Sequence, residues 1–417
     1  MISLLVLLPL KGRHLGTDPV LGALGVLLAY IIFSAVYAYL QFGVPYTEQI
    51  SKSYRGYIEM LTVAVALGWW LAARPNALFP VLVMAVSALL IRILIHIDWH
   101  DPLGYMATVR RPGFGMAVIH FALSAALSLV GLLVFSRRIL GAGTSWTARF
   151  VVAVIFVFAL GVVAYAFGLT LTRMAWLAFA VAVPWVMIYM VANRTQPFAG
   201  ARARALLSII MAISLVAVIW HQWDKIGPRV ITEFDEFVAA AQLDGAHVGD
   251  GSIGLRYKAL VWGRDRFEER PILGWGIGTF DPLKEKTDDV NLSLHHLHNL
   301  YMQVLVEMGL VGAALTALFL ILLGQSVFRA YREGLFPSDV VVWLALSMLV
   351  AALWAMGNDK IWQAKVRNPF TFLFGVAMAI HFVRMEAHRL RRRRGSAAGS
   401  QDPAQGPGPG SDPGAAS

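Results

Sequence analysis

Three histidines and an asparagine, His295, His296, His298 and Asn299, stand where a long polar segment gives way to an apolar run. Histidine changes charge near neutral pH, which makes it the usual general base in enzymes. If the apolar run is a helix, His298 lies at its N-terminus, where the partial positive charge favours a neutral imidazole. Asn299 would either orient that ring or cap the helix. The pattern therefore predicts a general base, His298, at a helix start.

The same histidines suggest two other interpretations. His295 and His298 would lie one helical turn apart, as in some metal sites, but no HExxH motif is present and no carboxylate stands at ligand spacing. A buried histidine bonded to a backbone carbonyl is the other alternative. We favour the general base, expect no metal and no cofactor, and keep His295 as a possible supporting residue.

Composition defines the class of protein. Hydrophobic residues make up 58% of the 417 residues and charged residues only 14%, whereas soluble chains are about 25% charged. The chain is therefore expected to be an all-α polytopic membrane protein. It has no cysteine, which excludes disulfides and thiolate chemistry. The net charge of +10 is assigned to cytoplasmic loops and lipid headgroups rather than to nucleic acid.

Ten apolar runs are long enough to cross about 30 Å of hydrocarbon, and residues 1–10 form a shorter one, so we expect ten to twelve spans. The ten runs are 20–40, 56–73, 77–96, 114–135, 149–168, 174–192, 205–221, 299–325, 339–356 and 369–386. They divide the chain into N-terminal spans (1–221), a loop domain (222–298), C-terminal spans (299–388) and a basic, disordered tail (389–417).

Clusters of lysine and arginine occur at every second boundary between the runs, which places those loops in the cytoplasm. The loop domain then lies on the opposite side. Helices are expected there at 231–243 and 254–271, followed by a glycine-rich stretch at 271–280. Its glycine spacing departs from G-x-G-x-x-G, so we favour a tight structural turn over a phosphate-binding loop.

The outer side also carries more cations than a membrane protein usually places there, and two arginines are singled out. Arg173 ends a Thr-rich turn, GLTLTR, between two spans, and Arg256 lies early in the second loop helix. Guanidinium binds phosphate oxygens in pairs and keeps its charge. Together they could stabilise a diphosphate leaving group, although a salt bridge explains either one alone.

Four segments make the chain similar to the bacterial O-antigen ligase family, whose relatives include O-antigen polymerases and protein O-oligosaccharyltransferases. The segments are LTRMAWL (171–177), GLRYKALVW (254–262), RPILGWGIGTF (270–280) and HNLYMQVLVEMGLVG (298–312). The resemblance implies a metal-independent transferase with a fold related to C-type membrane glycosyltransferases. It would make His298 catalytic, Arg173 and Arg256 the periplasmic arginines that bind diphosphate, and Asp359 a supporting acidic residue.

The resemblance also implies a reaction in the inner membrane, with the site facing the periplasm. The donor would be O-antigen polysaccharide on undecaprenyl diphosphate, and the acceptor a sugar hydroxyl of the lipid A–core oligosaccharide. Transfer in one step would invert the anomeric centre. An O-antigen polymerase and a non-enzymatic transporter of lipid-linked sugar remain the alternatives. A transporter is expected to place charges at the bilayer midplane, whereas here most lie in outer loops.

Overall fold

The computed structural model describes residues 18–97, 100, 111–192, 252–286, 296–358 and 363–399. Within these ranges the chain is helical and has no strand, which confirms the all-α membrane fold. The predicted span at 205–221 and the predicted loop helix at 231–243 lie outside the described residues. So do residues 1–10, His295 and Asp359.

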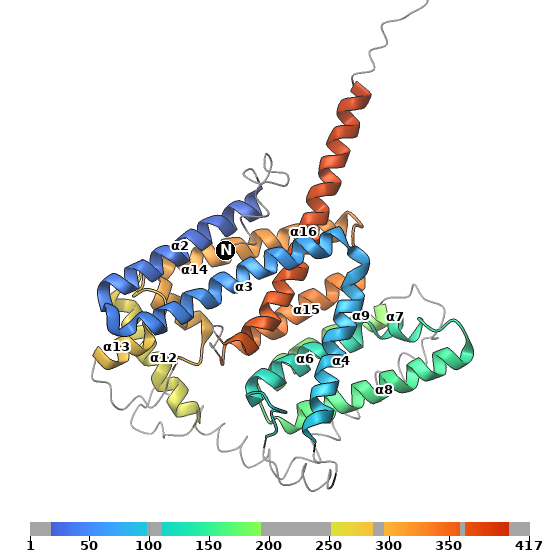
Figure 1. Cartoon of the computed structure of the whole chain (residues 1–417), viewed down its shortest axis with the longest axis horizontal. Coiled ribbons are helices and arrows are strands. Elements are labelled where there is room, and N and C mark those ends of the chain that lie inside the picture. Colours follow the sequence, from blue (N-terminus) through green and yellow to red (C-terminus); the bar gives the residue numbers. More distant parts are fainter. Residues whose placement is uncertain are drawn as a thin grey trace, which may run out of the picture.

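Figure 1 shows how the described helices are arranged. They are α2 (Pro19–Phe42), η2 (Val44–Tyr46), α3 (Thr47–Ala73), η3 (Pro75–Ala77), α4 (Leu78–His96), α6 (Val118–Val134), α7 (Ser136–Leu140), α8 (Trp146–Leu169), α9 (Arg173–Ala192), α12 (Ser252–Glu269), α13 (Phe280–Lys286), α14 (Leu300–Arg332), α15 (Ser338–Ala355) and α16 (Ala364–Gly399).

Nine of these helices correspond to nine of the ten predicted spans. Eight are long and apolar enough to cross a membrane, and α6, with 17 residues, is slightly shorter. The helix α12 matches the predicted second loop helix and ends at Glu269, before Pro271. A proline cannot continue a helix easily, because it lacks the N–H and restricts the residue before it.

The helices define two ends of the molecule. At the first, the basic end, α7 meets the start of α15 through an ion pair between Arg138 and Asp339. The end of α14 and the middle of α16 meet there as well, through Glu333 and Arg384. At the other, the loop end, α12 and α13 lie beside the start of α14 (Figure 1). Two of the cationic loops that the positive-inside rule groups on one side, those of Arg138 and Arg332, lie at the basic end.

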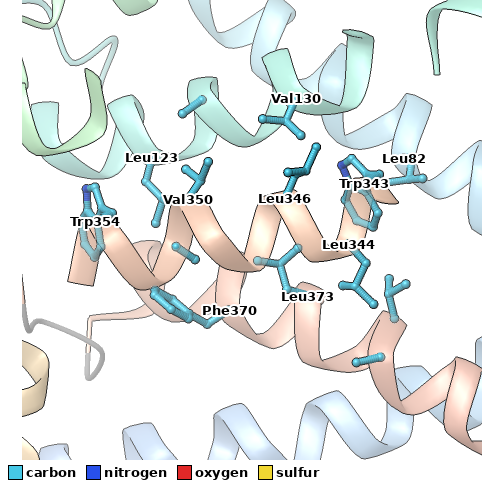
Figure 2. Close-up of a cluster of buried hydrophobic side chains, with 14 of the residues drawn as sticks. Leu82, Leu123, Val130, Trp343, Leu344, Leu346, Val350, Trp354, Phe370 and Leu373 are labelled. Atoms are coloured by element: carbon cyan, nitrogen blue, oxygen red, sulfur yellow. The ribbon is translucent and has the colours of Figure 1, made fainter. Parts of the chain in front are cut away.

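The core lies around α15, which is surrounded by α6, α9 and α16. Figure 2 shows Trp343, Leu346, Val350 and Trp354 of α15 packed between Leu123 and Val130 of α6 and Phe370 and Leu373 of α16. Another close contact joins α3 and α16, where a Cβ added at Gly68 would lie 2.9 Å from the carbonyl oxygen of Gly375. Small residues at such crossings allow backbones to approach in membrane bundles.

Two predicted boundaries were wrong. The helix α3 begins at Thr47, nine residues before the predicted apolar run, because polar helix-forming residues extend it beyond the hydrocarbon. Glu48 and Lys52, one turn apart, pair there at 2.5 Å. The helix α16 continues to Gly399, whereas the sequence predicts a disordered tail from residue 389. Adding a residue to an existing helix needs no new nucleation, which favours such an extension.

Candidate functional site

His298 lies immediately before α14, as predicted, and its backbone has an unusual conformation. Asn299 is the N-cap: its Oδ1 accepts hydrogen bonds from the N–H groups of Tyr301 and Met302, both at 3.0 Å. Of the two predicted roles for Asn299, the structure therefore places it in the cap. His298 itself has a φ of 54°, in the left-handed region that residues with a Cβ rarely adopt.

A second histidine supports this conformation. His296 is buried, and its Nδ1 accepts a hydrogen bond from the backbone N–H of His298 at 3.2 Å. The two imidazole rings are 3.7 Å apart between centroids. His298 is only half-buried, so the pair presents one sheltered ring and one accessible ring. Among the residues that the structure describes, no group of three His, Cys, Asp or Glu side chains is placed to hold a metal.

Arg173 is the first residue of α9 and its side chain is exposed. The threonines before it fix the turn that presents it. Thr170 Oγ1 donates to the carbonyl oxygen of Phe167 at 2.7 Å, and Thr172 Oγ1 donates to that of Thr170 at 3.3 Å. Leu171, between them, has a φ of 47°. The Thr-rich turn is therefore a defined structure that orients the start of α9.

Arg256 lies in the second turn of α12 and is half-buried. Burial lowers the pKa of its guanidinium, and the positive charge of Arg111 lowers it further. A nearby like charge disfavours the charged form of each group. Arg111 and Arg256 therefore form a pair of neighbouring cations, in which a bound anion would relieve the unfavourable electrostatic energy.

Arg111 also connects this pair to the turn before Arg173. Its Nε donates a hydrogen bond to the carbonyl oxygen of Thr170 at 3.1 Å. Arg111 therefore interacts electrostatically with Arg256 and is hydrogen-bonded to the turn that precedes Arg173. Arg111 is the residue that our sequence reasoning did not single out. A double arginine next to a proline and two glycines, RRPGFG, was the only sign of it.

The histidine and the arginines belong to elements that meet at the loop end. In α12, a Cβ added at Gly263 would lie 2.8 Å from Met302 Cγ and 3.2 Å from Leu297 Cδ2, so this helix crosses beside His298. The hydroxyl of Tyr301 donates to the carbonyl oxygen of Ala352 in α15 at 2.9 Å. Direct contact of His298 with the arginines in one cavity stays a prediction.

The backbone strain of the described residues is concentrated in this region. Four residues other than glycine have a positive φ: Arg111, Phe114, Leu171 and His298. Two are candidate site residues, Leu171 belongs to the turn before Arg173, and Phe114 is three residues after Arg111. Strained conformations persist only where the surroundings enforce them, and they gather at functional sites. The strain therefore marks the same region as the charges.

The glycine-rich stretch at 271–280 is a structural element, as the sequence indicated, and it fits into a break in α14. The backbone of α14 departs from helical geometry at Gly309, which has φ 62° and ψ −168°. Four hydrogen bonds join the two segments there. They are Trp275 N to Val306 O (2.9 Å), Gly276 N to Glu307 O (2.7 Å), Leu310 N to Pro271 O (2.8 Å) and Val311 N to Ile272 O (3.1 Å).

These bonds satisfy the backbone groups that the break in α14 leaves unpaired. The two chains approach so closely that a Cβ at Gly274 would lie 2.6 Å from the backbone nitrogen of Gly309. The span predicted at 299–325 is therefore present as a helix, but it is interrupted at Gly309, which the sequence did not indicate. Its first three turns, which follow His298, are attached to the 271–280 stretch rather than being a simple extension of the span.

Residues 156–317 match the family whose model is described as O-antigen ligase. This part of the chain is therefore similar to O-antigen ligases. The matched residues include Arg173, Arg256 and His298, whereas Arg111 precedes them. Comparison with curated proteins gave no match. The family supports a glycosyltransferase activity of the O-antigen ligase or polymerase kind, in a multi-pass membrane protein.

Proposed function

We infer that this protein transfers O-antigen polysaccharide from undecaprenyl diphosphate to a sugar hydroxyl of lipid A–core. The observation that supports this most directly is the pair of neighbouring cations, Arg111 and Arg256, beside the turn of Arg173. Such a group suits the diphosphate of a lipid-linked donor, since guanidinium forms paired hydrogen bonds with phosphate oxygens. The family match favours the same class of donor.

In this proposal, His298 is the general base. A ring nitrogen of His298 takes the proton of the acceptor hydroxyl as the oxygen of that hydroxyl attacks the anomeric carbon. The bond from the anomeric carbon to the diphosphate oxygen breaks, and undecaprenyl diphosphate leaves with the electron pair. Arg173 and Arg256 hold the charge that develops on it, as preorganised donors do in other transfer reactions. Attack from the face opposite the leaving group inverts the anomeric centre.

The supporting roles follow from position. Asn299 keeps the start of α14 ordered next to His298, through its cap hydrogen bonds. We propose that the loop end faces the periplasm of the inner membrane, because the basic end carries the arginine-rich tail. No metal or other cofactor is assigned a role, since the arginines supply the positive charge. His295 and Asp359 stay as predicted supporting residues.

The test is transfer by the purified protein, with EDTA, a glycan on undecaprenyl diphosphate, and lipid A–core. Wild type is compared with His298→Ala and with His388→Ala, which removes a half-exposed histidine at the basic end. We expect product on lipid A–core from wild type and His388→Ala, and a loss of about 10²–10⁴-fold in His298→Ala, which is the usual contribution of a general base.

Other outcomes would identify the alternatives. Longer lipid-linked chains without product on lipid A–core would mean that the protein is an O-antigen polymerase. No glycosidic product at all, together with movement of the lipid-linked glycan across vesicles, would mean transport. Equal activity in wild type and His298→Ala would remove His298 from the mechanism while leaving the reaction in place.

A further inference from the structure

A cavity of about 750 Å³ lies among α4, α6, α8 and the start of α16, away from the α12–α14 contact. Its wall is made almost entirely of apolar side chains, among them Phe79, Leu82, Leu127, Phe156 and Phe372. In Figure 1, α4, α6 and α8 lie side by side at the opposite side of the molecule from α2 and α12. A cavity of this size falls in the range of ligand sites.

Arg92 is the only charged residue among those that line the cavity in the described part of the chain. It lies near the end of α4, at the loop end, whereas Phe79 is the second residue of α4, at the basic end. Arg92 Nε donates to the carbonyl oxygen of Phe114 at 2.7 Å, and Nη2 donates to that of Gly115 at 2.6 Å. The cavity is thus apolar along its length and cationic at its outer mouth.

The length of the cavity distinguishes between possible lipid chains. Phe79 and Arg92 are 13 residues apart on one helix, which corresponds to roughly 20 Å. One leaflet provides about 15 Å, half of the hydrocarbon thickness. An acyl chain of an ordinary phospholipid, anchored at the outer surface, therefore ends before the cavity does. A long polyisoprenoid chain, anchored at the same surface, would fill it.

The mouth of the cavity is connected to the arginines described above. The residues that Arg92 binds, Phe114 and Gly115, follow Arg111 in one short strained segment. Arg111 in turn donates a hydrogen bond to Thr170, in the turn before Arg173, and its charge lowers the pKa of Arg256. A lipid whose tail enters the cavity beside Arg92 would therefore carry its diphosphate toward Arg111 and Arg256.

We propose that this cavity holds the polyisoprenoid chain of the lipid diphosphate donor, with Arg92 at the point where the chain meets its diphosphate. The inference rests on the proposed function for the identity of the donor. It adds a tail site that extends past the bilayer midplane and assigns Arg92 to the donor side of the reaction. The acceptor, which is also anchored by lipid chains, must then approach from another side of the loop end.

The first experiment measures binding without catalysis. Full-length protein in nanodiscs is illuminated with undecaprenyl diphosphate that carries a diazirine about 20 Å along its chain from the diphosphate, which matches the length of the cavity. The labelled peptides are then identified by mass spectrometry. We expect labels on residues of the basic half of the cavity, such as Phe79, Phe135 and Ile139. Labels confined to lipid-facing residues outside the cavity would overturn the proposal, as would equal labelling by a phosphatidylglycerol with a diazirine at the end of its acyl chain.

The second experiment fills the cavity. Ser128→Trp places a large side chain inside it, and Val157→Trp adds the same side chain on α8 at an exposed position that does not line it. Each variant is assayed with a long-chain donor and with a farnesyl diphosphate donor of the same glycan. We expect Ser128→Trp to lose about tenfold or more in kcat/KM with the long-chain donor. Activity with the farnesyl donor, which also reports on folding, stays at the wild-type level, and Val157→Trp behaves as wild type.

The results separate the two proposals. Equal losses with both donors in Ser128→Trp would mean that the cavity only supports the fold, and the tail site would be wrong. Specific labelling of the cavity without transfer by the wild type would keep the tail site and remove the proposed reaction. Transfer by the wild type without labelling of the cavity would keep the proposed reaction and remove the tail site.

Discussion

Arginine side chains have different hydrogen-bond partners at the two ends of the molecule. At the basic end, arginines meet carboxylates: Arg138 binds Asp339 through two hydrogen bonds of 2.8 Å, and Arg384 donates to Glu333 at 3.0 Å. At the loop end, Arg92 and Arg111 donate to backbone carbonyls, and Arg111 disfavours the charge of Arg256. Arg367, near the start of α16, pairs with Glu59 at 2.7 Å.

From this difference we expect the charges of the basic end to serve mainly the fold and those of the loop end to serve a ligand as well. An arginine bound to a carboxylate joins two helices, and its energetic contribution is already made in the free protein. Neighbouring cations disfavour each other's charge, an anionic ligand lowers that cost, and perturbed groups of this kind are typical of functional sites. Substitutions of arginine at the basic end should therefore lower mainly stability, and those at the loop end should lower mainly catalytic activity.

The largest difference is expected between Arg256→Gln and Arg138→Gln. Losing a charge that stabilises the leaving diphosphate should lower kcat/KM by about 10²–10³-fold, as is usual for such donors. Arg138→Gln breaks an ion pair that is partly exposed, so it should cost at most about 1 kcal/mol of stability and leave kcat/KM unchanged. Both are measured with the lipid A–core assay and by thermal unfolding. A similar loss of activity in the two variants would contradict the division between the ends.

The next prediction concerns α14, whose two ends also differ. Gly309, near the loop end, has a backbone conformation that essentially only glycine adopts, and a Cβ there would collide with the carbonyl oxygen of Ile272. Gly309→Ala should therefore destabilise the protein by about 2–3 kcal/mol. Gly324 lies in the regular part of the same helix, and a Cβ there meets nothing within 4 Å. Gly324→Ala should stabilise by up to about 1 kcal/mol.

Thermal unfolding of the two glycine variants measures this contrast. Transfer activity should fall in Gly309→Ala well below its melting temperature, because the break holds the turns that follow His298. If Gly309→Ala were as stable and as active as Gly324→Ala, the break would be an incidental bend. The pairing of α14 with the 271–280 stretch would then have no part in positioning the site.

Arg111→Gln tests the like-charge pair with a smaller effect. The variant loses one phosphate contact, so the KM for the donor should rise about tenfold. The variant also loses the hydrogen bond from Arg111 to Thr170, which lowers stability, but it removes the repulsion between Arg111 and Arg256, which raises stability. Its melting temperature should therefore fall less than that of Arg367→Gln, which leaves Glu59 without its partner. The opposite order would mean that Arg111 is a structural cation like those at the basic end.

Much of the fold could be predicted from the sequence, because the requirements of a bilayer are local. The span that begins at Leu300 and its Asn299 cap follow from apolar length and one side chain, as does the end of α12 before Pro271. The break at Gly309 could not be predicted in the same way. It depends on backbone groups of 271–276, which are distant in sequence and show no pattern that pairs them with α14.

The site residues also differ in whether local sequence or tertiary contacts reveal them. His298, Arg173 and Arg256 were found because each stands beside a recognisable segment at the edge of a span or loop helix. Arg111 was one of many cations on the outer side, and only its place beside Arg256 and Thr170 separates it from the rest. Such a grouping depends on tertiary contacts between segments far apart in the chain, which neither composition nor spacing reveals.

The smallest predicted effect is the pH dependence of the basic end. Burial raises the pKa of Glu333, but hydrogen bonds from Arg384 and His388 outweigh it, and the net result is a pKa below the ordinary value of 4.5. A carboxylate whose pKa is lowered by folding contributes stability that is present above the unfolded pKa and is lost as the pH falls through the folded one.

Glu333→Gln should therefore melt below wild type at about pH 6, by on the order of 1–2 °C, since such pairs contribute at most about 1 kcal/mol. The difference should shrink as the pH falls from 4.5 toward about 3, whereas Glu386→Gln, which removes a more exposed carboxylate of α16, should show little difference throughout. A gap between wild type and Glu333→Gln that widens on acidification would mean that Glu333 is not the charged partner of Arg384 and His388, and that the basic end is held by something other than its ion pairs.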